Sequence, residues 1–313
     1  MHPDTVAVIL QKAKETWASS NDIEITLEAN PTSVEAGRFT GYRDAGVNRV
    51  SIGVQALNNA DLRKLGRLHN VDEAKKAVEL AGNTFERISF DLIYARQDQS
   101  LQEWRAELNE ALTMPANHLS LYQLTIEQGT AFADRFAAGG LHGLPHEDLA
   151  ADMYELTQEL IEKAGFYAYE VSNHAKNGAE SRHNLIYWNA GDYAGVGPGA
   201  HGRITLGQSR IATEAISDPH DWLNSVNTKG TGELGETIQS NAERADEYLM
   251  MGLRLNDGIS IQRYNNILGE DLNSSKIKYL ADIGMIVVNS DKLATTKTGK
   301  PLLNAIIREL LTE

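Results

Sequence analysis

Four polar side chains stand where the pattern of the chain predicts the ends of short strands: Glu28, Gln55, Asp91 and Gln123. In parallel α/β folds, catalytic and binding groups gather at the carboxyl ends of the strands. A carboxylate that leaves water needs a partner or a ligand with hydrogen-bond donors, and the vicinal hydroxyls of a sugar are such donors. These side chains therefore indicate a binding site. The alternative is that they cap helices or satisfy one another.

The segments before these residues have the alternation of strands. They are residues 22–28, 49–55, 87–94 and 118–124, and a helix-length stretch follows each one, as in a parallel sheet. Capping boxes at 32–35 and 100–103 predict helix starts, and Gly46, Gly82 and Gly165 predict helix ends. A closed barrel needs eight such units. We therefore predict an α/β fold with an incomplete parallel (β/α) barrel, opened by a helix over residues 3–17.

The rest of the chain predicts a second, smaller domain. Residues 146–164 have the pattern of an acidic helix, residues 166–215 are rich in glycine and aromatics, and residues 216–240 have the polar composition of a linker. A helix over 241–255, a strand pair within 285–295 and a helix over 299–311 resemble a winged helix. We expect a partial barrel over 1–165, a connecting region and linker over 166–240, and an α+β winged-helix-like domain over 241–313.

Composition narrows the possible functions. The 313 residues have a formal net charge of −14, which disfavours nucleic-acid binding, and residues 241–313 carry 9 basic and 10 acidic residues, so the winged-helix pattern does not predict DNA binding. No stretch is apolar and long enough to span a membrane, and residues 1–5 do not resemble a secretory signal. We expect a cytoplasmic protein.

Two weaker motifs do not predict a site. Residues 195–200 contain GxGxxA, but Pro198 lies inside it and no helix pattern follows, so a tight loop is the better interpretation. His142 and His146 are four residues apart, but Gly143 and Pro145 argue against one helical face. We expect no metal site in this chain.

Several collinear motifs resemble the radical S-adenosylmethionine (SAM) proteins related to oxygen-independent coproporphyrinogen III oxidase, and among these the heme-chaperone branch. The motifs are EANP at 28–31, NRVSIGVQ at 48–55, LGR at 65–67, DLIY at 91–94, HNLIYW at 183–188 and GVGPGAHG at 195–202. The stretch from 244 to 286 is similar to the C-terminal domain of that family. The resemblance extends over nearly the whole chain.

The resemblance implies two sets of site residues. The implied SAM pocket consists of Glu28, which would bind the ribose, together with Gln55, Arg67 and Asp91. The implied heme segment consists of His183, Asn184, Tyr187 and Trp188. A neutral imidazole can be an axial ligand of iron, and aromatic rings can stack on a porphyrin. Without the resemblance, His183 would be interpreted as an ordinary surface or core histidine.

One part of the family's chemistry has no counterpart in these residues. The resemblance implies a CxxxCxxC loop whose thiolates hold a 4Fe–4S cluster, and the chain has no cysteine. We expect that loop to lie upstream of Met1, and we expect no radical activity from this chain alone. The front edge of the sheet would then be open and covered by another chain, by self-association for example, or poorly ordered. The family's Gly-Leu-Pro turn after DLIY is replaced by ARQD at 95–98, which affects the geometry around Asp91.

Two functions remain open at this point. The first is a heme chaperone that binds heme and delivers it to a client protein. The second is the oxidase that converts propionates of coproporphyrinogen III to vinyl groups in porphyrin biosynthesis, in which case the intact protein is an enzyme. A family member that has lost its ligands is a third possibility. The HNLIYW motif favours the chaperone.

Overall fold

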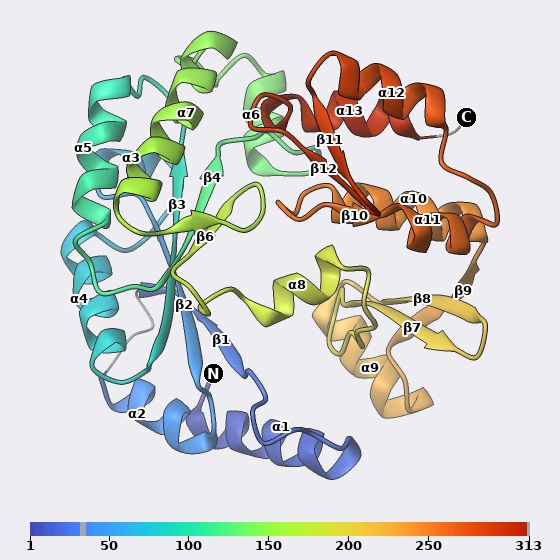
Figure 1. Ribbon diagram of the computed structural model, residues 1–313. Helices are drawn as coiled ribbons and strands as arrows, with labels where there is room; N and C mark the ends of the chain where they lie inside the picture. Colours follow the sequence, from blue (N-terminus) through green and yellow to red (C-terminus); the bar gives the residue numbers. More distant parts are fainter. Residues whose placement is uncertain (32–35, 312–313) are drawn as a thin grey trace. The chain divides into compact units, whose positions relative to one another are not determined.

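The structure is a computed structural model of the chain and describes residues 1–31 and 36–311 (Figure 1). It divides into two units, Met1–Glu180 and Ser181–Glu313. Each unit is described by itself below. The capping box predicted at 32–35 lies outside the described residues, and the predicted domain boundaries at 165 and 240 remain predictions.

A six-stranded open sheet forms the first unit. Its strands are β1 (Thr26–Ala29), β2 (Arg49–Gln55), β3 (Arg87–Tyr94), β4 (His118–Gln123), β5 (Tyr167–Ala168) and β6 (Asn173–Ala175). Their order across the sheet is β1-β2-β3-β4-β6-β5. Strands β1 to β4 are parallel, whereas β6 is antiparallel to β4 and to β5. The predicted incomplete barrel is confirmed, because four parallel strands form an open sheet with β1 at its edge.

The helices of this unit follow the strands as predicted. They are α1 (Pro3–Thr16), α2 (Ala36–Ala45), α3 (Asn59–Lys64), α4 (Val71–Gly82), α5 (Leu101–Ala111), α6 (Ala131–Ala137) and α7 (Glu147–Lys163). Ser100 and Glu103 form the predicted capping box of α5, with the Ser100 side chain accepting from the Glu103 N–H. Asn70 and Glu73 form a second box on α4.

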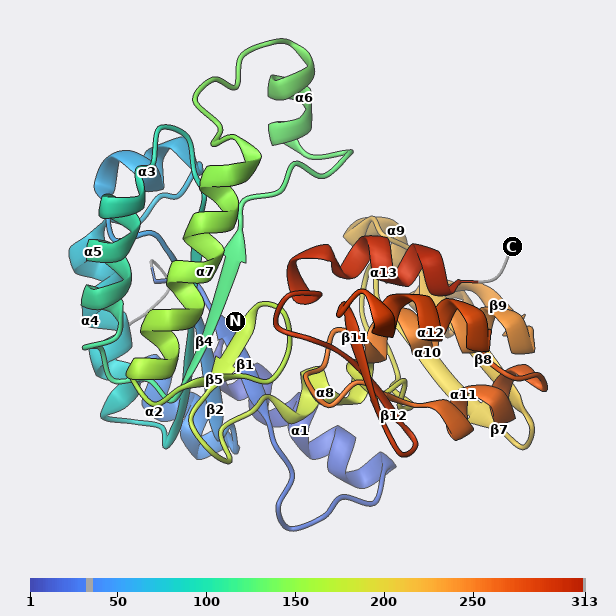
Figure 2. The same ribbon diagram turned by 45° about the horizontal axis from the view of Figure 1, so that its top comes forward.

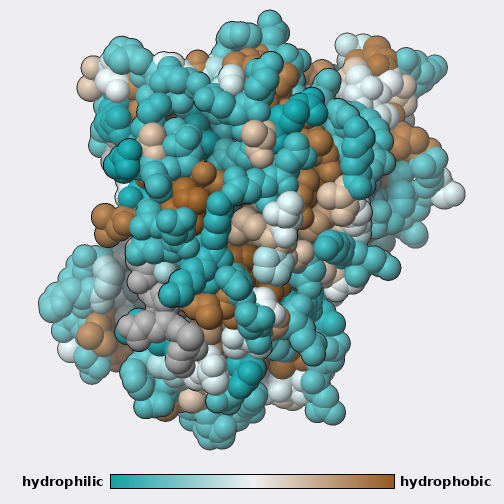
Figure 3. Space-filling view, turned by 90° about the vertical axis from the view of Figure 1, so that its left-hand side faces the viewer, coloured by the Kyte–Doolittle hydropathy of each residue, from teal (hydrophilic) through white to brown (hydrophobic). Residues whose placement is uncertain are grey.

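One face of this sheet is apolar and carries the helices. Val50, Ile52 and Val54 of β2 and Phe90 and Leu92 of β3 are fully buried there. They pack with buried residues of α1, α2, α4, α5 and α7, and α4, α5 and α7 lie along one side of the sheet in both ribbon views (Figures 1 and 2). The outer surface on this side is largely hydrophilic (Figure 3). The other face of the sheet is therefore the one that a barrel would turn inward.

Two asparagines, each just before a strand, make the same pair of side-chain hydrogen bonds to the backbone of a neighbouring segment. Asn48, just before β2, accepts from the N–H of Ile25 and donates to the carbonyl of Ile23, both at 2.8 Å. Asn117, just before β4, bonds in the same way to the N–H of Ile88 at 3.0 Å and the carbonyl of Glu86 at 2.9 Å. Each amide replaces a ladder bond where the neighbouring strand begins, so the register of the parallel strands is set at this end.

The second unit contains two antiparallel sheets of three strands. The strands are β7 (His201–Leu206), β8 (Ser209–Ala215), β9 (Glu233–Gln239), β10 (Ile259–Ser260), β11 (Ile286–Asn289) and β12 (Lys292–Thr295). Their orders are β7-β8-β9 and β10-β12-β11. The helices are α8 (Arg182–Trp188), α9 (Pro219–Lys229), α10 (Asn241–Gly252), α11 (Ile261–Leu268), α12 (Ser274–Asp282) and α13 (Leu303–Leu310), with a 3₁₀ turn, η2 (Lys300–Leu302). The β11–β12 hairpin after α10, α11 and α12 agrees with the winged-helix-like prediction.

Residues 216–240 form no linker, which corrects that prediction. Asp218 accepts from the N–H groups of His220 and Asp221 and begins α9, Pro219 occupies its first turn, and Gly230 ends it with a φ of 79°. Strand β9 follows and pairs with β8. Polar composition suggested a linker, but an Asp-Pro start and a glycine stop also delimit a solvent-exposed helix.

The GxGxxA segment is a tight loop, as predicted. A Cβ on Gly195 would lie 2.2 Å from the carbonyl oxygen of His201, so only glycine lets the two backbones approach here. Gly197 and Gly199 have φ of 123° and 69°.

Candidate functional site

The inward face of the first sheet is polar, in contrast to the helix-covered face. Glu28 of β1 is in register with Ser51 of β2, and Asp91 of β3 is in register with Ser120 of β4. Ser51 in turn pairs with Ser89, two residues before Asp91. Because alternate residues of a strand share a face, these side chains lie on one side of the sheet. The structure thus brings Glu28 and Asp91 to the same surface.

Asp91 has an unusual electrostatic environment. The pKa of its carboxyl is raised from 3.8 to about 6, chiefly by burial and to a lesser extent by the nearby Glu28 carboxylate, although Ser120, Arg49 and Ser51 act to lower it. Hydroxyls of Ser120 and Ser51 donate hydrogen bonds to it. A carboxyl with a raised pKa on a polar sheet face is a candidate ligand-binding group.

Gln55 is placed by an irregularity at the end of β2. The register of β2 against β3 shifts between Ile52 and Gln55, and Gln55 has a φ of 70°, which non-glycine residues seldom adopt. Its amide nitrogen folds back over Gly53, where a Cβ would lie only 2.9 Å from it, and the side-chain oxygen of Asn30 lies 3.9 Å from the same point. The bulge therefore turns a buried amide toward the end of β1.

Arg67 is placed by the turn that ends α3. Gly66 has a φ of 70°, and the Arg67 N–H donates to the carbonyl of Leu62 at 2.8 Å. The Nε of Arg67 is buried and has no hydrogen-bond partner within residues 1–31 and 36–311. A buried guanidinium N–H without a partner is costly, and an anionic or carbonyl group of a ligand would satisfy it.

The start of the strands carries a buried polar chain that the sequence did not reveal. The Nδ1 of His118 lies 2.7 Å from the Ser89 hydroxyl, and its Nε2 lies 2.8 Å from the hydroxyl of Tyr169. Burial, followed by the charge of Arg49, holds the pKa of His118 well below its usual value, so this imidazole is neutral. Arg87 pairs with Glu24 at 2.9 Å in the same layer. The alternation of residues 118–123 contained the signal, since it places His118 and Ser120 on one face.

The ARQD segment after β3 forms a buried ion cluster. Ala95 and Asp98 have φ of 56° and 59°. Between them, the guanidinium of Arg96 lies 2.9 Å from Asp61 and 2.6 Å from Glu107. The departure from the family's turn is thus accommodated by an ion cluster on the helix side of the sheet, while Asp91 keeps its place on the polar face.

The four residues of the implied heme segment lie together on α8, in the second unit. His183 is exposed, and its Nε2 lies 3.0 Å from the hydroxyl of Tyr187, with the rings edge-to-face at 4.7 Å. The backbone N–H of Asn184 donates to the hydroxyl oxygen of Ser181, the residue that caps the start of α8. The ring of Tyr187 also packs on Tyr193 at 4.3 Å between centroids. An imidazole and aromatic rings therefore share one short, partly exposed helix.

Trp188 ends this helix and is held by a cation–π contact. The guanidinium of Arg254 lies 4.8 Å from its ring centroid. The Nε1–H of Trp188 is buried and finds no hydrogen-bond partner in the part of the chain that the structure describes. The ring is thus fixed in place, and one donor remains for a ligand or a water.

The donor sets fit organic ligands better than an iron–sulfur cluster. Carboxylate, amide and guanidinium groups suit hydroxyls and a carboxylate of a nucleoside-type ligand. The 313 residues supply no thiolate, which an iron–sulfur cluster requires. Within residues 1–31 and 36–311, no group of three or more His, Cys, Asp or Glu is placed to hold a metal ion. No helix among the described residues has the length and apolarity needed to cross a membrane.

Comparison with known proteins identifies the family. Residues 1–111 match the radical SAM superfamily, and residues 239–302 match the HemN C-terminal domain. The chain is 37% identical over 99% of its length to the mitochondrial radical S-adenosyl methionine domain-containing protein 1 of Mus musculus, of which it covers 72%. It is 36% identical, again over 99% of its length, to the heme chaperone HemW of Haemophilus influenzae, of which it covers 79%.

A solved structure supports the fold. The coproporphyrinogen III oxidase HemN of Escherichia coli superposes on 100% of this chain with a TM-score of 0.81, covers 75% of its own length in the match, and is 18% identical. This similarity concerns the fold. Together with the sequence identities, it shows that the chain belongs to the radical SAM family, in the HemW-like branch related to HemN.

Proposed function

We propose that this chain binds heme and delivers it to a client protein, as a heme chaperone of the HemW type. The observation that carries the proposal is α8, where the exposed imidazole of His183 stands beside the ring of Tyr187 on a helix whose last residue is Trp188. Similar proteins named heme chaperones support it, at 36% and 35% identity. An exposed histidine with adjacent aromatic rings suits iron ligation and porphyrin stacking.

The contact between His183 and Tyr187 determines how heme would bind. Nε2 of His183 is the ring nitrogen in contact with the Tyr187 hydroxyl, so ligation of iron through this nitrogen requires that hydroxyl to move away. The whole Tyr187 side chain has to turn for this, and it is only partly buried. Asn184 and the Nε1–H of Trp188 would then supply hydrogen bonds to the bound group. Heme is proposed to supply the iron; the chain supplies the imidazole and the aromatic surface.

We also propose that Glu28, Gln55, Arg67 and Asp91 form the SAM pocket of the first unit. The shared face of Glu28 and Asp91, the folded-back amide of Gln55 and the partnerless Nε of Arg67 support this. SAM and a 4Fe–4S cluster are the cofactors of the family, and any thiolates for the cluster would come from outside these 313 residues. The HNLIYW helix favours the chaperone over the oxidase, so radical turnover is not part of the proposal.

A heme titration of this chain, followed by absorbance, tests the main proposal. We expect a saturable Soret shift that is lost or displaced in His183→Ala. The matched control is His220→Ala, because His220 is also exposed, lies in the same unit, and contacts the start of α9 through its backbone N–H. Equal titrations of both variants and the unmodified chain would refute ligation by His183.

Tyr187→Phe sharpens the test. It keeps the ring packed against Tyr193 and removes the hydroxyl that contacts Nε2 of His183. If the imidazole ligates iron through Nε2, this variant should bind heme at least as tightly as the unmodified chain. A loss of heme binding equal to that of His183→Ala would instead mean that the hydroxyl itself contacts the ligand.

Two predictions on assembly and location complete the proposal. Strand β1 is a sheet edge, and edge strands pair readily with other chains, so we propose that this edge self-associates or meets a partner. Sedimentation velocity of the purified chain tests self-association, and a monomer at all concentrations would refute it. We further propose a cytoplasmic location. Cell fractionation tests this location. Recovery of the protein with organelles would contradict it, and this outcome is worth checking because the name of the similar mouse protein includes the word mitochondrial.

A further inference from the structure

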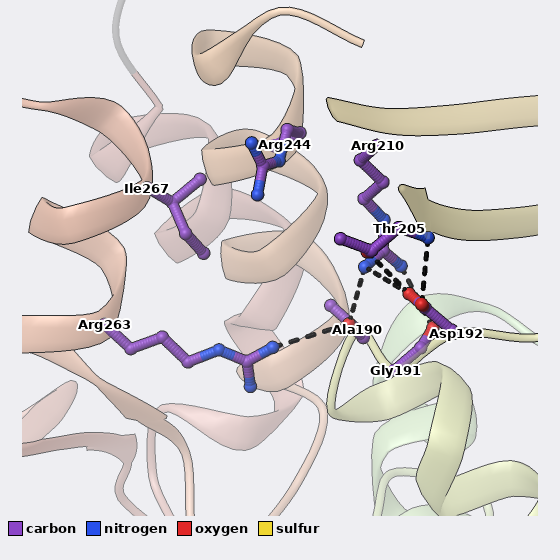
Figure 4. A pocket seen from close by; sticks show the side chains of 8 residues that line it. All are labelled: Ala190, Gly191, Asp192, Thr205, Arg210, Arg244, Arg263 and Ile267. Carbon is purple, nitrogen blue, oxygen red and sulfur yellow. Dashed lines mark hydrogen bonds and ion pairs between the residues drawn. The ribbon is translucent and has the colours of Figure 1, made fainter. Parts of the chain in front are cut away.

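A cavity of about 310 Å³ in the second unit is lined by three arginines. Arg210 enters from β8, Arg244 from α10 and Arg263 from α11. Figure 4 shows these side chains reaching toward the cavity from helices on one side and strands on the other. The chain as a whole has a net charge of −14, so a gathering of cations here runs against its composition.

The charges around this arginine cavity do not cancel. Arg210 lies 3.5 Å from Asp192 and 3.7 Å from Glu247. Glu247 is itself held by Arg203 at 2.9 Å. Arg244 and Arg263 have no carboxylate partner within the part of the chain that the structure describes. The charges of Arg203 and Arg210 are thus balanced by Asp192 and Glu247, and the two positive charges of Arg244 and Arg263 remain.

Part of this arrangement has a purely structural role. Arg210 and Arg263 both donate to the carbonyl of Ala190, at 2.9 and 3.4 Å, and Arg263 also donates to the carbonyl of Asn189 at 2.9 Å. These bonds satisfy carbonyl groups just after the end of α8, as cations at a helix carboxyl end commonly do.

Arg244 has no such structural task. Its Nη1 donates to the carbonyl of Gln208 at a long 3.3 Å, and its buried Nε has no hydrogen-bond partner among the described residues. Burial lowers the pKa of nearby Arg210, and the charge of Arg244 is among those that lower it further. Mutual repulsion and an unsatisfied buried N–H are both relieved by an anion placed between the guanidinium groups.

The size and lining of the cavity limit the kind of anion. A volume of about 310 Å³ exceeds what a single small ion fills, and it lies at the lower end of small-molecule sites. Ile267 adds an apolar wall, and the Thr205 hydroxyl already donates to Asp192 at 2.8 Å. Guanidinium groups bind carboxylate and phosphate oxygens in a bidentate manner.

We propose that the arginine cavity binds a small dianion whose charges lie on oxygen atoms, with Arg244 as its principal contact. Two negative charges match the two uncompensated guanidinium groups. The oxygens can belong to a short dicarboxylate or to a phosphoryl group. This site goes beyond heme binding and does not depend on it.

Calorimetric titration of the 313-residue chain with succinate and, separately, with inorganic phosphate tests the proposal. We expect at least one of them to bind, and Arg244→Gln to raise its dissociation constant about tenfold or more, as loss of a charged hydrogen bond does. Arg244→Lys keeps the charge without the bidentate geometry and should fall between. Preference for succinate identifies a carboxylate ligand, and preference for phosphate a phosphoryl ligand.

The matched control is Arg308→Gln, which removes an exposed arginine of α13 outside the cavity and should leave the dissociation constant unchanged. Arg263→Gln, on the exposed side of α11, serves as a second variant should Arg244→Gln unfold, and it should also weaken binding. The proposal is overturned if neither anion binds at low ionic strength. It is equally overturned if Arg244→Gln, correctly folded by circular dichroism, binds as tightly as Arg308→Gln.

Discussion

Replacement of Asp91 by asparagine should stabilise the first unit at neutral pH. Burial holds the pKa of this carboxyl near 6 instead of 3.8, so the ionised form is disfavoured in the fold. At 1.36 kcal/mol for each tenfold change in proton affinity, that difference corresponds to about 3 kcal/mol. Asparagine has nearly the same shape, and it can keep hydrogen bonds with Ser120 and Ser51. Because Asp91 is partly open to solvent, we take about 3 kcal/mol as an upper bound.

The sign of the pH dependence follows from the raised pKa. Below about pH 4, Asp91 is protonated in both the folded and the unfolded chain, and the two proteins should differ little. As the pH rises from about 4 to about 6, only the unfolded chain loses this proton freely, so the unmodified protein loses stability relative to Asp91→Asn. Above about pH 7 the full difference should be present.

Urea unfolding at about pH 4 and about pH 7.5, on either side of the pI near 5.1, measures this difference. Glu79→Gln is the control, because it neutralises an exposed carboxylate on α4, and its effect should be small at both pH values. Equal unfolding free energies of Asp91→Asn and the unmodified chain at both pH values would refute the reasoning. So would a less stable Asp91→Asn at pH 7.5, since it would mean that the ionised carboxylate stabilises the fold.

Three further substitutions test the packing. Arg96→Met should lower the unfolding free energy by about 3–5 kcal/mol in urea, because it leaves Glu107 buried without its cation, and adding Glu107→Gln should restore part of the loss. Trp104→Phe should cost about 1–3 kcal/mol in thermal unfolding, because the indole is fully buried and its N–H donates to a buried hydroxyl at 2.8 Å. Gly258→Ala should destabilise far more than Gly269→Ala. Both have a positive φ, but only at Gly258 would the new Cβ collide with a carbonyl oxygen, at 1.9 Å.

The strands and helices of the first unit were predictable because their signals are local. The predicted bounds of β2 and β3, 49–55 and 87–94, are those of the structure, since alternation and short polar connections define them without tertiary information. The capping box at Ser100 fixed the start of α5 in the same way. The open sheet followed from the number of such units.

The finer features of the site depend on contacts that no local pattern contains. The pKa of Asp91 is set by its burial and by Ser120, which lies 29 residues further along the chain. The left-handed backbone of Gln55 arises from a bulge between neighbouring strands, and nothing in NRVSIGVQ marks it. Arg210 lies in no motif, and the family resemblance that begins at Arg244 gives that residue no role, so only the fold brings the two to one cavity. The polar composition of 216–240 hid a helix for the same reason.

Four of the residues that the family resemblance singled out share a physical property, which argues that ligands shaped them. Asp91 is a carboxylic acid at a position where burial disfavours its ionised form. Gln55 has a positive φ, which residues with a side chain seldom adopt. Arg67 and Trp188 each have a buried N–H that no described residue accepts from. These features lower the stability of the fold, and at each position another amino acid would avoid the unfavourable term. Their presence at these positions is expected if a bound group supplies the missing partners, so ligand binding should stabilise each unit by satisfying groups that the fold leaves unpaired.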